Sequence, residues 1–175
     1  MSGALNAFKI KGGFGFTMDM RRKDRHITQA DRIVSIIDGC SVCRIAMQDG
    51  EGLYIVPLSF GYEYSGVDNI KLYFHSANEG RKLRAITARP DVAFEMDCME
   101  GITQGDTACA YSCAYKSITG TARASIVCDT EEKQRALSLI MEHTAKKHFD
   151  FNSEQAAHVA IIRLDVKSIS AKGSD

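Results

Sequence analysis

The sequence has no excess of charge of either sign and no long hydrophobic run. Lys and Arg together number 22, as do Asp and Glu, so the formal net charge is zero. Such a chain exerts no diffuse attraction on nucleic acids or anionic membranes, so any anion-binding site must be local. No run approaches the roughly 18 apolar residues that a membrane-spanning helix requires. We therefore expect no nucleic-acid partner and no membrane partner.

The sequence also lacks a secretory signal. Lys9 and Lys11 follow the few apolar residues near the N-terminus instead of preceding them, and a glycine-rich segment at 12–15 interrupts any apolar region. We expect residues 1–19 to be a flexible leader ahead of one domain over residues 20–175. Without such a signal, the six cysteines should be reduced thiols, which predicts a cytoplasmic protein.

Metal-binding patterns are missing as well. Cys40 and Cys43 have the spacing of a zinc knuckle, but no second pair follows at a matching distance, and zinc needs four converging ligands. We expect these cysteines to be buried or incidental thiols. His143 and His148 are five residues apart and do not share the helix face that a metalloprotease motif requires, so we expect both on the surface and no metal site.

What the sequence does contain is a series of short strands with a few helices. We predict helices that start near Thr28 and end at Gly39, over 79–88, from Thr130 to about His148, and over 153–157. We predict strands over 41–48, 53–64, 70–75, 92–96, 111–126 and 159–166, with a bulge or bend at Gly120 and a mobile loop over 101–105. Tight turns join the early strands, so they pair antiparallel. The predicted fold is mainly β (α+β): a six-stranded antiparallel split barrel with peripheral helices.

One segment points to a phosphate site. A strand ends at Phe74–His75–Ser76, and a helix then begins with Arg81, Lys82 and Arg84 in or near its first turn. Cations are unfavourable at that end of a helix, where free backbone N–H groups also need an acceptor. A bound phosphate would satisfy both groups. The alternative interpretation, a solvated basic face, fits these residues equally well.

This segment resembles the flavin-phosphate segment of the pyridoxamine 5'-phosphate oxidase-like, FMN-binding split-barrel superfamily, most closely the branch of the nitroimidazole-resistance proteins. Further segments match in order and spacing: Met20–Arg25, Val56–Leu58, Tyr115–Arg123, and Ile161–Asp165 with Ile169. The resemblance covers roughly residues 20–172. The C-terminus lacks the basic and aromatic residues with which true pyridoxamine-phosphate oxidases hold their substrate, so we do not expect vitamin B6 oxidation. We expect a loop over the cysteine-rich segment 98–113, which does not align with the family pattern.

The resemblance implies a homodimer with FMN bound at the subunit interface. It places the FMN phosphate on Arg81 and Lys82 with help from Ser76 and His75, and the isoalloxazine edge on the main chain around Val56, Pro57, Leu58 and Ser59. Tyr115 and Ser117 would add contacts from a neighbouring strand or from the partner subunit. His75 is the one candidate for a catalytic or substrate-contacting residue, although a structural role explains it equally well.

The implied activity is an FMN-dependent oxidoreductase. An external donor, such as a nicotinamide nucleotide, would reduce the flavin, which would pass electrons to a small acceptor such as a nitroaromatic compound. Three alternatives use the same scaffold, since a fold does not determine a function: a non-catalytic flavin-binding or sensing protein, a haem-binding barrel with a histidine ligand, and a deazaflavin-dependent protein.

Overall fold

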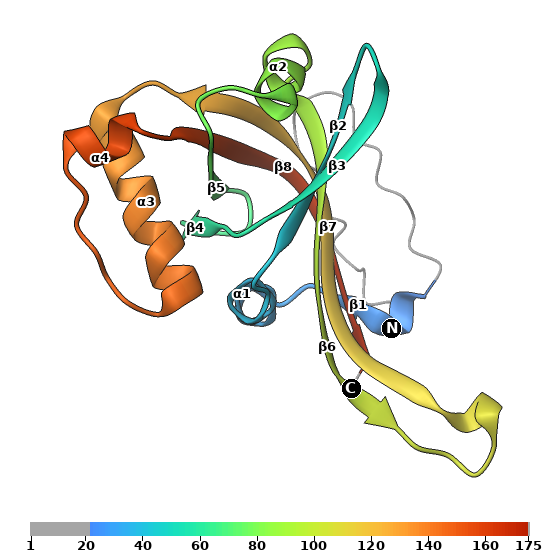
Figure 1. The fold of residues 1–175 in the computed structure, drawn as a ribbon. Coiled ribbons are helices and arrows are strands. Elements are labelled where there is room, and N and C mark those ends of the chain that lie inside the picture. The colour runs from blue at the N-terminus through green and yellow to red at the C-terminus, as the bar shows by residue number, and fades with distance from the viewer. Residues whose placement is uncertain (1–21, 175) are drawn as a thin grey trace, which may run out of the picture.

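A computed structural model describes residues 22–174, and the predicted leader at 1–19 lies outside them. These residues form one antiparallel sheet of eight strands in the order β3-β2-β6-β7-β8-β5-β4, with β1 paired to β8 (Figure 1). Among the described strands, β3 and β4 are the two edges and do not pair, so the sheet is open. The mainly antiparallel split-barrel fold predicted from the sequence is thereby confirmed. The strands are β1 (His26–Ile27), β2 (Cys43–Asp49), β3 (Gly52–Leu58), β4 (Gly61–Tyr64), β5 (Ile70–Ser76), β6 (Asp91–Thr103), β7 (Ser112–Val127) and β8 (Ala160–Ser174).

Between residues 22 and 174, four α-helices accompany the sheet. They are α1 (Ala30–Gly39), α2 (Arg81–Ala88), α3 (Thr130–Ala145) and α4 (Ser153–Ala157). The side chain of Asp129 caps α3 by accepting a hydrogen bond from the Glu132 N–H, and Asn152 and Gln155 form a capping box at α4. In Figure 1, α2 lies at one end of the sheet, α1 lies below β4, and α3 and α4 lie together at one side. No helix among the described residues is long and apolar enough to cross a bilayer.

Successive side chains of the central strands point to opposite faces of the sheet, and each face has its own hydrophobic core. On β5, Leu72 and Phe74 point into the main core, whereas Tyr73 points into a smaller core beneath α3 and α4. Ile161 and Ile162 on β8 divide in the same way. Side chains of α1 and α2 complete the main core. A central strand that is covered on both faces in this way holds the start of α2 in a fixed position.

Several strand boundaries differ from the prediction. The strand predicted over 53–64 is two strands, β3 and β4, that are separated at Ser59–Phe60, and the two-residue β1 was not predicted. Both differences raise the strand count from six to eight. β8 extends to Ser174 because β7 supplies hydrogen-bond partners along its whole length, although the small polar residues after Val166 look like a turn in the sequence.

The segment 98–113 is largely a hairpin and not a loop. β6 runs to Thr103, so the mobile loop predicted over 101–105 begins only after strand pairing ends. A bulge between Met99 and Gly101 shifts the register, after which Ile102 still pairs with Cys113. This hairpin projects away from the rest of the sheet (Figure 1). Near the predicted bend at Gly120, the register between β7 and β8 shifts at Thr121–Ala122.

The prediction of a surface position for His143 is wrong. Its side chain is buried, with Nδ1 2.8 Å from the Phe60 carbonyl oxygen and Nε2 3.1 Å from that of Ile37. The reason is helical spacing: Ala136, Ile140 and His143 recur on the inward face of α3. His148 is exposed as predicted and contacts Glu142 and Asp150.

Cys40 and Cys43 are buried, as the sequence predicted. Burial raises the pKa of each thiol to about 12. Such thiols remain protonated at neutral pH and are poor nucleophiles and metal ligands. Within residues 22–174, no group of three His, Cys, Asp or Glu side chains is placed to hold a metal ion.

Candidate functional site

The predicted phosphate segment lies where β5 ends and α2 begins. His75 is exposed, whereas Ser76 is buried and its hydroxyl donates a hydrogen bond to the Ala77 carbonyl oxygen at 3.0 Å. Gly80 precedes the helix with a φ of 136°, a conformation that side chains rarely adopt. The glycine thus turns the chain from the central strand directly into α2.

The N-terminus of α2 has free hydrogen-bond donors. Gly80 provides no side-chain cap, and no acidic residue stands in the first turn. The backbone N–H groups there have no partner within the helix, and the helix dipole adds partial positive charge. Lys82 is half-buried beside them, and within the described part of the chain its side chain makes no ion pair or hydrogen bond. These groups suit a phosphate.

Arg81 is held by an acidic partner that the sequence pattern does not reveal. Its Nε lies 2.7 Å from Asp49 Oδ2 and its Nη2 lies 3.0 Å from Asp49 Oδ1, and the guanidinium carbon lies 4.6 Å from the centre of the Tyr54 ring. Glu51 is 3.5 Å from Nη1. A phosphate at Arg81 must therefore share the guanidinium with Asp49. In the sequence, the segment from Asp49 to Gly52 indicates only a tight turn between two strands, and nothing there indicates a contact with α2.

The ion pair gives Asp49 a measurable acid response. Hydrogen bonds from Arg81 and from the Glu51 backbone N–H lower the pKa of this carboxyl to about 2, against an ordinary value of 3.8. A lowered folded-state pKa contributes stability above pH 3.8 that is lost as the pH falls through about 2. We expect Asp49→Asn to lose stability at pH 5 and to converge with the wild type near pH 2. Urea unfolding at pH 5, 3.5 and 2 measures this, and a difference that is constant over that range would contradict it.

The predicted isoalloxazine contacts lie at the end of β3. Val56 and Leu58 are half-buried and pack against the main core, whereas Pro57 and Ser59 are exposed. Tyr54, which lies under Arg81, is two residues before Val56 on the same face of the strand. The structure therefore brings the β3 residues and Arg81 to one side of the molecule.

Tyr115 and Ser117 lie elsewhere in the chain. They pair with the C-terminal end of β8, Tyr115 with Ser174 and Ser117 with Lys172. The end of β7 that lies beside α2 is Ile126–Val127, nine residues beyond Ser117, or about 30 Å along an extended strand. Tyr115 instead contacts Arg25 at 3.5 Å. One chain alone does not bring these two residues to Arg81.

The chemical groups at the β5–α2 junction are those of a binding site. Among the described residues, the junction combines the unpaired Lys82, the paired Arg81, free N–H donors and a buried hydroxyl next to an exposed imidazole. That set can bind a phosphate group and hold an attached aromatic system against β3. It contains no paired acid and base and no activated nucleophile, so redox chemistry here would need a bound cofactor.

Known proteins resemble this chain in sequence and in fold. Residues 29–173 match the sequence profile of the family described as pyridoxamine 5'-phosphate oxidase. A candidate 5-nitroimidazole antibiotic resistance protein from Bacteroides thetaiotaomicron is 30% identical, with a TM-score of 0.72 over 85% of this chain and 86% of that one. No curated protein is significantly similar in sequence.

Two more distant structures share the fold. A protein from Mycobacterium smegmatis that binds FAD and haem is 18% identical, with a TM-score of 0.70 over 86% of this chain and 74% of that one. An FAD-binding protein from Mesorhizobium loti is 21% identical, with a TM-score of 0.57 over 85% and 96%. The profile match covers most of the chain, from the start of α1 to Gly173 in β8, so the chain belongs to the pyridoxamine 5'-phosphate oxidase family.

Proposed function

We propose that the chain binds FMN and acts as an oxidoreductase that reduces a small acceptor, such as a nitroaromatic compound, with an external electron donor. The main support for this proposal is the start of α2. There, uncapped N–H groups and Lys82 lie a short turn after Ser76, the last residue of β5. The 30% identical resistance protein supports the choice of acceptor. The flavin, when bound, would supply the hydride and electron chemistry.

The chain's own residues would bind and orient the cofactor. Lys82 and the N–H groups of α2 would hold the phosphate, with Arg81 sharing its guanidinium between the phosphate and Asp49. The main chain from Val56 to Ser59 would contact the isoalloxazine edge. His75 is exposed beside this site and is therefore accessible to a substrate.

A second copy of the chain is part of this proposal. Tyr115 and Ser117 can reach the flavin only from a partner subunit, because they are remote from α2 in their own chain. Leu53 and Ile55, on the outward face of edge strand β3, are 84% and 64% exposed, which is unusual for large apolar side chains and typical of an interface. We place this dimer in the cytoplasm, where its six free cysteines would stay reduced.

The first experiment is a visible spectrum of the purified protein before and after addition of FMN. We expect flavin bands at about 375 and 450 nm, and at least about a tenfold loss of FMN affinity, or about 1.4 kcal/mol, in the double variant Arg81→Ala, Lys82→Ala. The control double variant Arg123→Ala, Lys147→Ala removes the same charge outside the first turn of α2, since Arg123 pairs with Asp91 beyond the other end of this helix, and it should bind FMN normally. Equal losses in both double variants would contradict the phosphate site.

Turnover then separates the candidate functions. Oxidation of NADH or NADPH that depends on a nitroaromatic acceptor supports the oxidoreductase, whereas stable FMN binding without turnover supports a non-catalytic flavin protein. A sharp band at about 400 nm in place of the flavin bands would indicate haem. A colourless protein that does not take up FMN would overturn the cofactor assignment.

A further inference from the structure

Three of the six cysteines lie together where α1 ends against the sheet. Cys40 is the C-terminal cap of α1 and Cys43 is the first residue of β2, and both are buried in the main core. Cys98 is half-buried on β6 and packs against the same core. Residues two apart on a strand share a face, so Cys98 follows Phe94 and Met96 toward that core. The fold thus gathers thiols that are far apart in the sequence.

The thiols of Cys40 and Cys98 are in contact. They share a hydrogen bond. A Cβ built on Gly39, the residue before Cys40, would lie 3.9 Å from Cys98 Sγ, which places that sulfur against the end of α1. Cys40 is fixed there because its backbone N–H donates to the carbonyl oxygens of Ile36 and Ile37, at 3.1 and 3.3 Å. The Cβ atoms of a disulfide are about 4 Å apart, so two thiols in hydrogen-bond contact need only small side-chain movements to join.

The two thiols differ in their access to solvent. Cys40 is 2% exposed, whereas Cys98 is half-buried, so a small oxidant in solution meets Cys98 first. Burial raises the pKa of Cys40 to about 12, and a negative charge on Cys98 would raise this pKa as well. Oxidation of Cys98 to a neutral sulfenic acid removes that charge. The first oxidation therefore makes the Cys40 thiolate easier to form beside its target.

We infer that Cys98 and Cys40 form a reversible disulfide, in which Cys98 reacts with hydrogen peroxide and Cys40 resolves the product. The Cys98 thiolate attacks the peroxide, so that an S–O bond forms, the O–O bond breaks and hydroxide leaves to become water. Cys40 then loses its proton and attacks the sulfur of this sulfenic acid. The S–S bond forms, the S–O bond breaks and a second water leaves. The two thiols lose two electrons, which the peroxide accepts. The inference is independent of the proposed function, because it involves no flavin.

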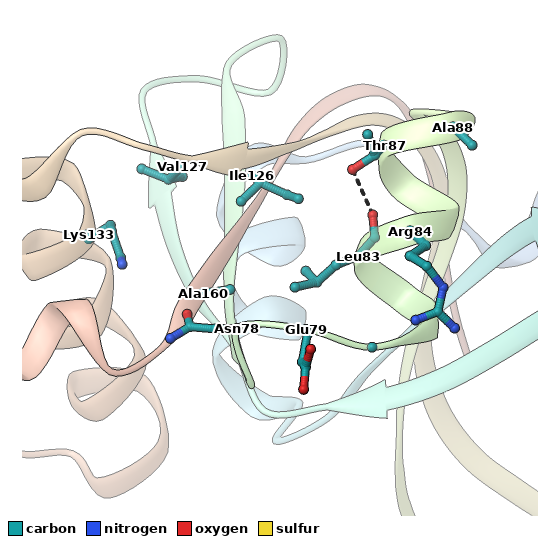
Figure 2. Close-up of a pocket in the computed structure, with 11 residues that line it drawn as sticks. Asn78, Glu79, Leu83, Arg84, Thr87, Ala88, Ile126, Val127, Lys133 and Ala160 are labelled. Carbon is teal, nitrogen blue, oxygen red and sulfur yellow. Dashed lines mark hydrogen bonds between the residues drawn. The ribbon is translucent and has the colours of Figure 1, made fainter.

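The other three thiols are exposed and have different surroundings. Cys109 and Cys113 are in the projecting hairpin, where Cys113 donates a hydrogen bond to the carbonyl oxygen of the next residue at 3.7 Å. Cys128 donates to the Ile126 carbonyl oxygen at 3.8 Å. Ile126 and Lys133 line a pocket of about 650 Å³ between α2 and α3 (Figure 2), so Cys128 follows the end of β7 beside that pocket. We expect peroxide to oxidise these thiols without joining any of them to Cys98.

The test is treatment of the reduced full-length protein with hydrogen peroxide, followed by blocking of the free thiols and cleavage before aspartates without reduction. Cleavage places Cys98 in the peptide 97–105, apart from Cys109 and Cys113, and leaves Cys40 and Cys43 together in the peptide 38–48. We expect mass spectrometry of the single-chain band from a non-reducing gel to find these two peptides joined with the loss of two hydrogens. Dithiothreitol should separate them. The joined protein should also unfold at a higher urea concentration than the reduced protein, because the link closes a long loop of the unfolded chain.

Cys43→Ala is the matched control for Cys40→Ala, since both thiols are buried in the same core and share one peptide. We expect the joined peptides to persist in Cys43→Ala and to be absent from Cys40→Ala and Cys98→Ala. A link that persists in Cys40→Ala, a link from Cys98 to Cys109 or Cys113, or a Cys98 that remains unlinked in the wild type would overturn the inference. If Cys40→Ala does not fold, fragmentation of the joined wild-type peptides shows whether Cys40 or Cys43 carries the link.

Discussion

Replacement of Gly61 with alanine is expected to destabilise the protein by about 3 kcal/mol, because the substitution forces apart two elements that touch through their backbones. A Cβ at position 61 would lie 2.4 Å from the Leu139 carbonyl carbon and 2.5 Å from the Ile140 nitrogen. Both neighbouring atoms belong to the α3 backbone and cannot rotate away as a side chain can. To admit one methyl group, β4 and α3 would have to separate.

The effect should extend beyond local packing. β4 forms an edge of the sheet, and α3 covers the smaller core that contains Tyr73 and Ile161. Separation of α3 from β4 would therefore expose apolar side chains of that core. Urea unfolding at neutral pH measures the change in the free energy of unfolding.

The control is Gly50→Ala. Gly50 stands in the β2–β3 turn, a Cβ added there would have no heavy atom within 4 Å beyond its chain neighbours, and its φ is not positive. We expect a change within about 0.5 kcal/mol for this substitution. Similar destabilisation by the two alanines would mean that the close approach of β4 to α3 is not what requires glycine at position 61.

The sequence was sufficient to predict the elements that carry a strong pattern. The helix that ends at Gly39 follows from its apolar spacing, and the structure has both this helix and the short helix predicted over 153–157. The central strand with alternating Leu72, Tyr73 and Phe74 is similarly evident. The extension of β6 and β8 was not predictable, because residues such as Ser168 and Gly173 have no strand preference and are held in the sheet only by the register of β7.

In the candidate site, too, the features with a local sequence pattern could be predicted and those that depend on tertiary contacts could not. The β5–α2 segment was found from residues that are adjacent in the sequence. The contact of Arg81 with Asp49 and Tyr54 joins residues about thirty positions apart, and it exists only because α2 packs beside the β2–β3 turn. The pocket with Ile126 and Lys133 combines three separate segments and has no sequence motif. A phosphate-binding segment can therefore be predicted when its residues are adjacent in the sequence. A carboxylate that competes with the phosphate for Arg81 cannot, because its position depends on tertiary packing.

The buried His143 gives the second large prediction. Its ring contacts the carbonyl oxygens of Ile37, in the last turn of α1, and of Phe60, between β3 and β4, and packs 4.3 Å from the Phe60 ring centre. His143→Ala removes the ring N–H donor next to these carbonyls and leaves a cavity, so we expect a loss of about 3 kcal/mol in the free energy of unfolding. Phe60 follows Ser59, a proposed flavin contact, so FMN affinity should fall as well.

His148→Ala is the matched control, because His148 is on the same stretch of chain but its side chain is 61% exposed and contacts only surface carboxylates. Exposed ion pairs contribute little, and we expect a change of less than about 1 kcal/mol. Urea unfolding and FMN titration of both variants provide the measurement. If His143→Ala lowers stability but leaves FMN affinity equal to that of His148→Ala, then His143 supports the fold without positioning the segment from β3 to β4. If both quantities fall, the buried histidine links α1 and α3 to the flavin-binding edge of the sheet.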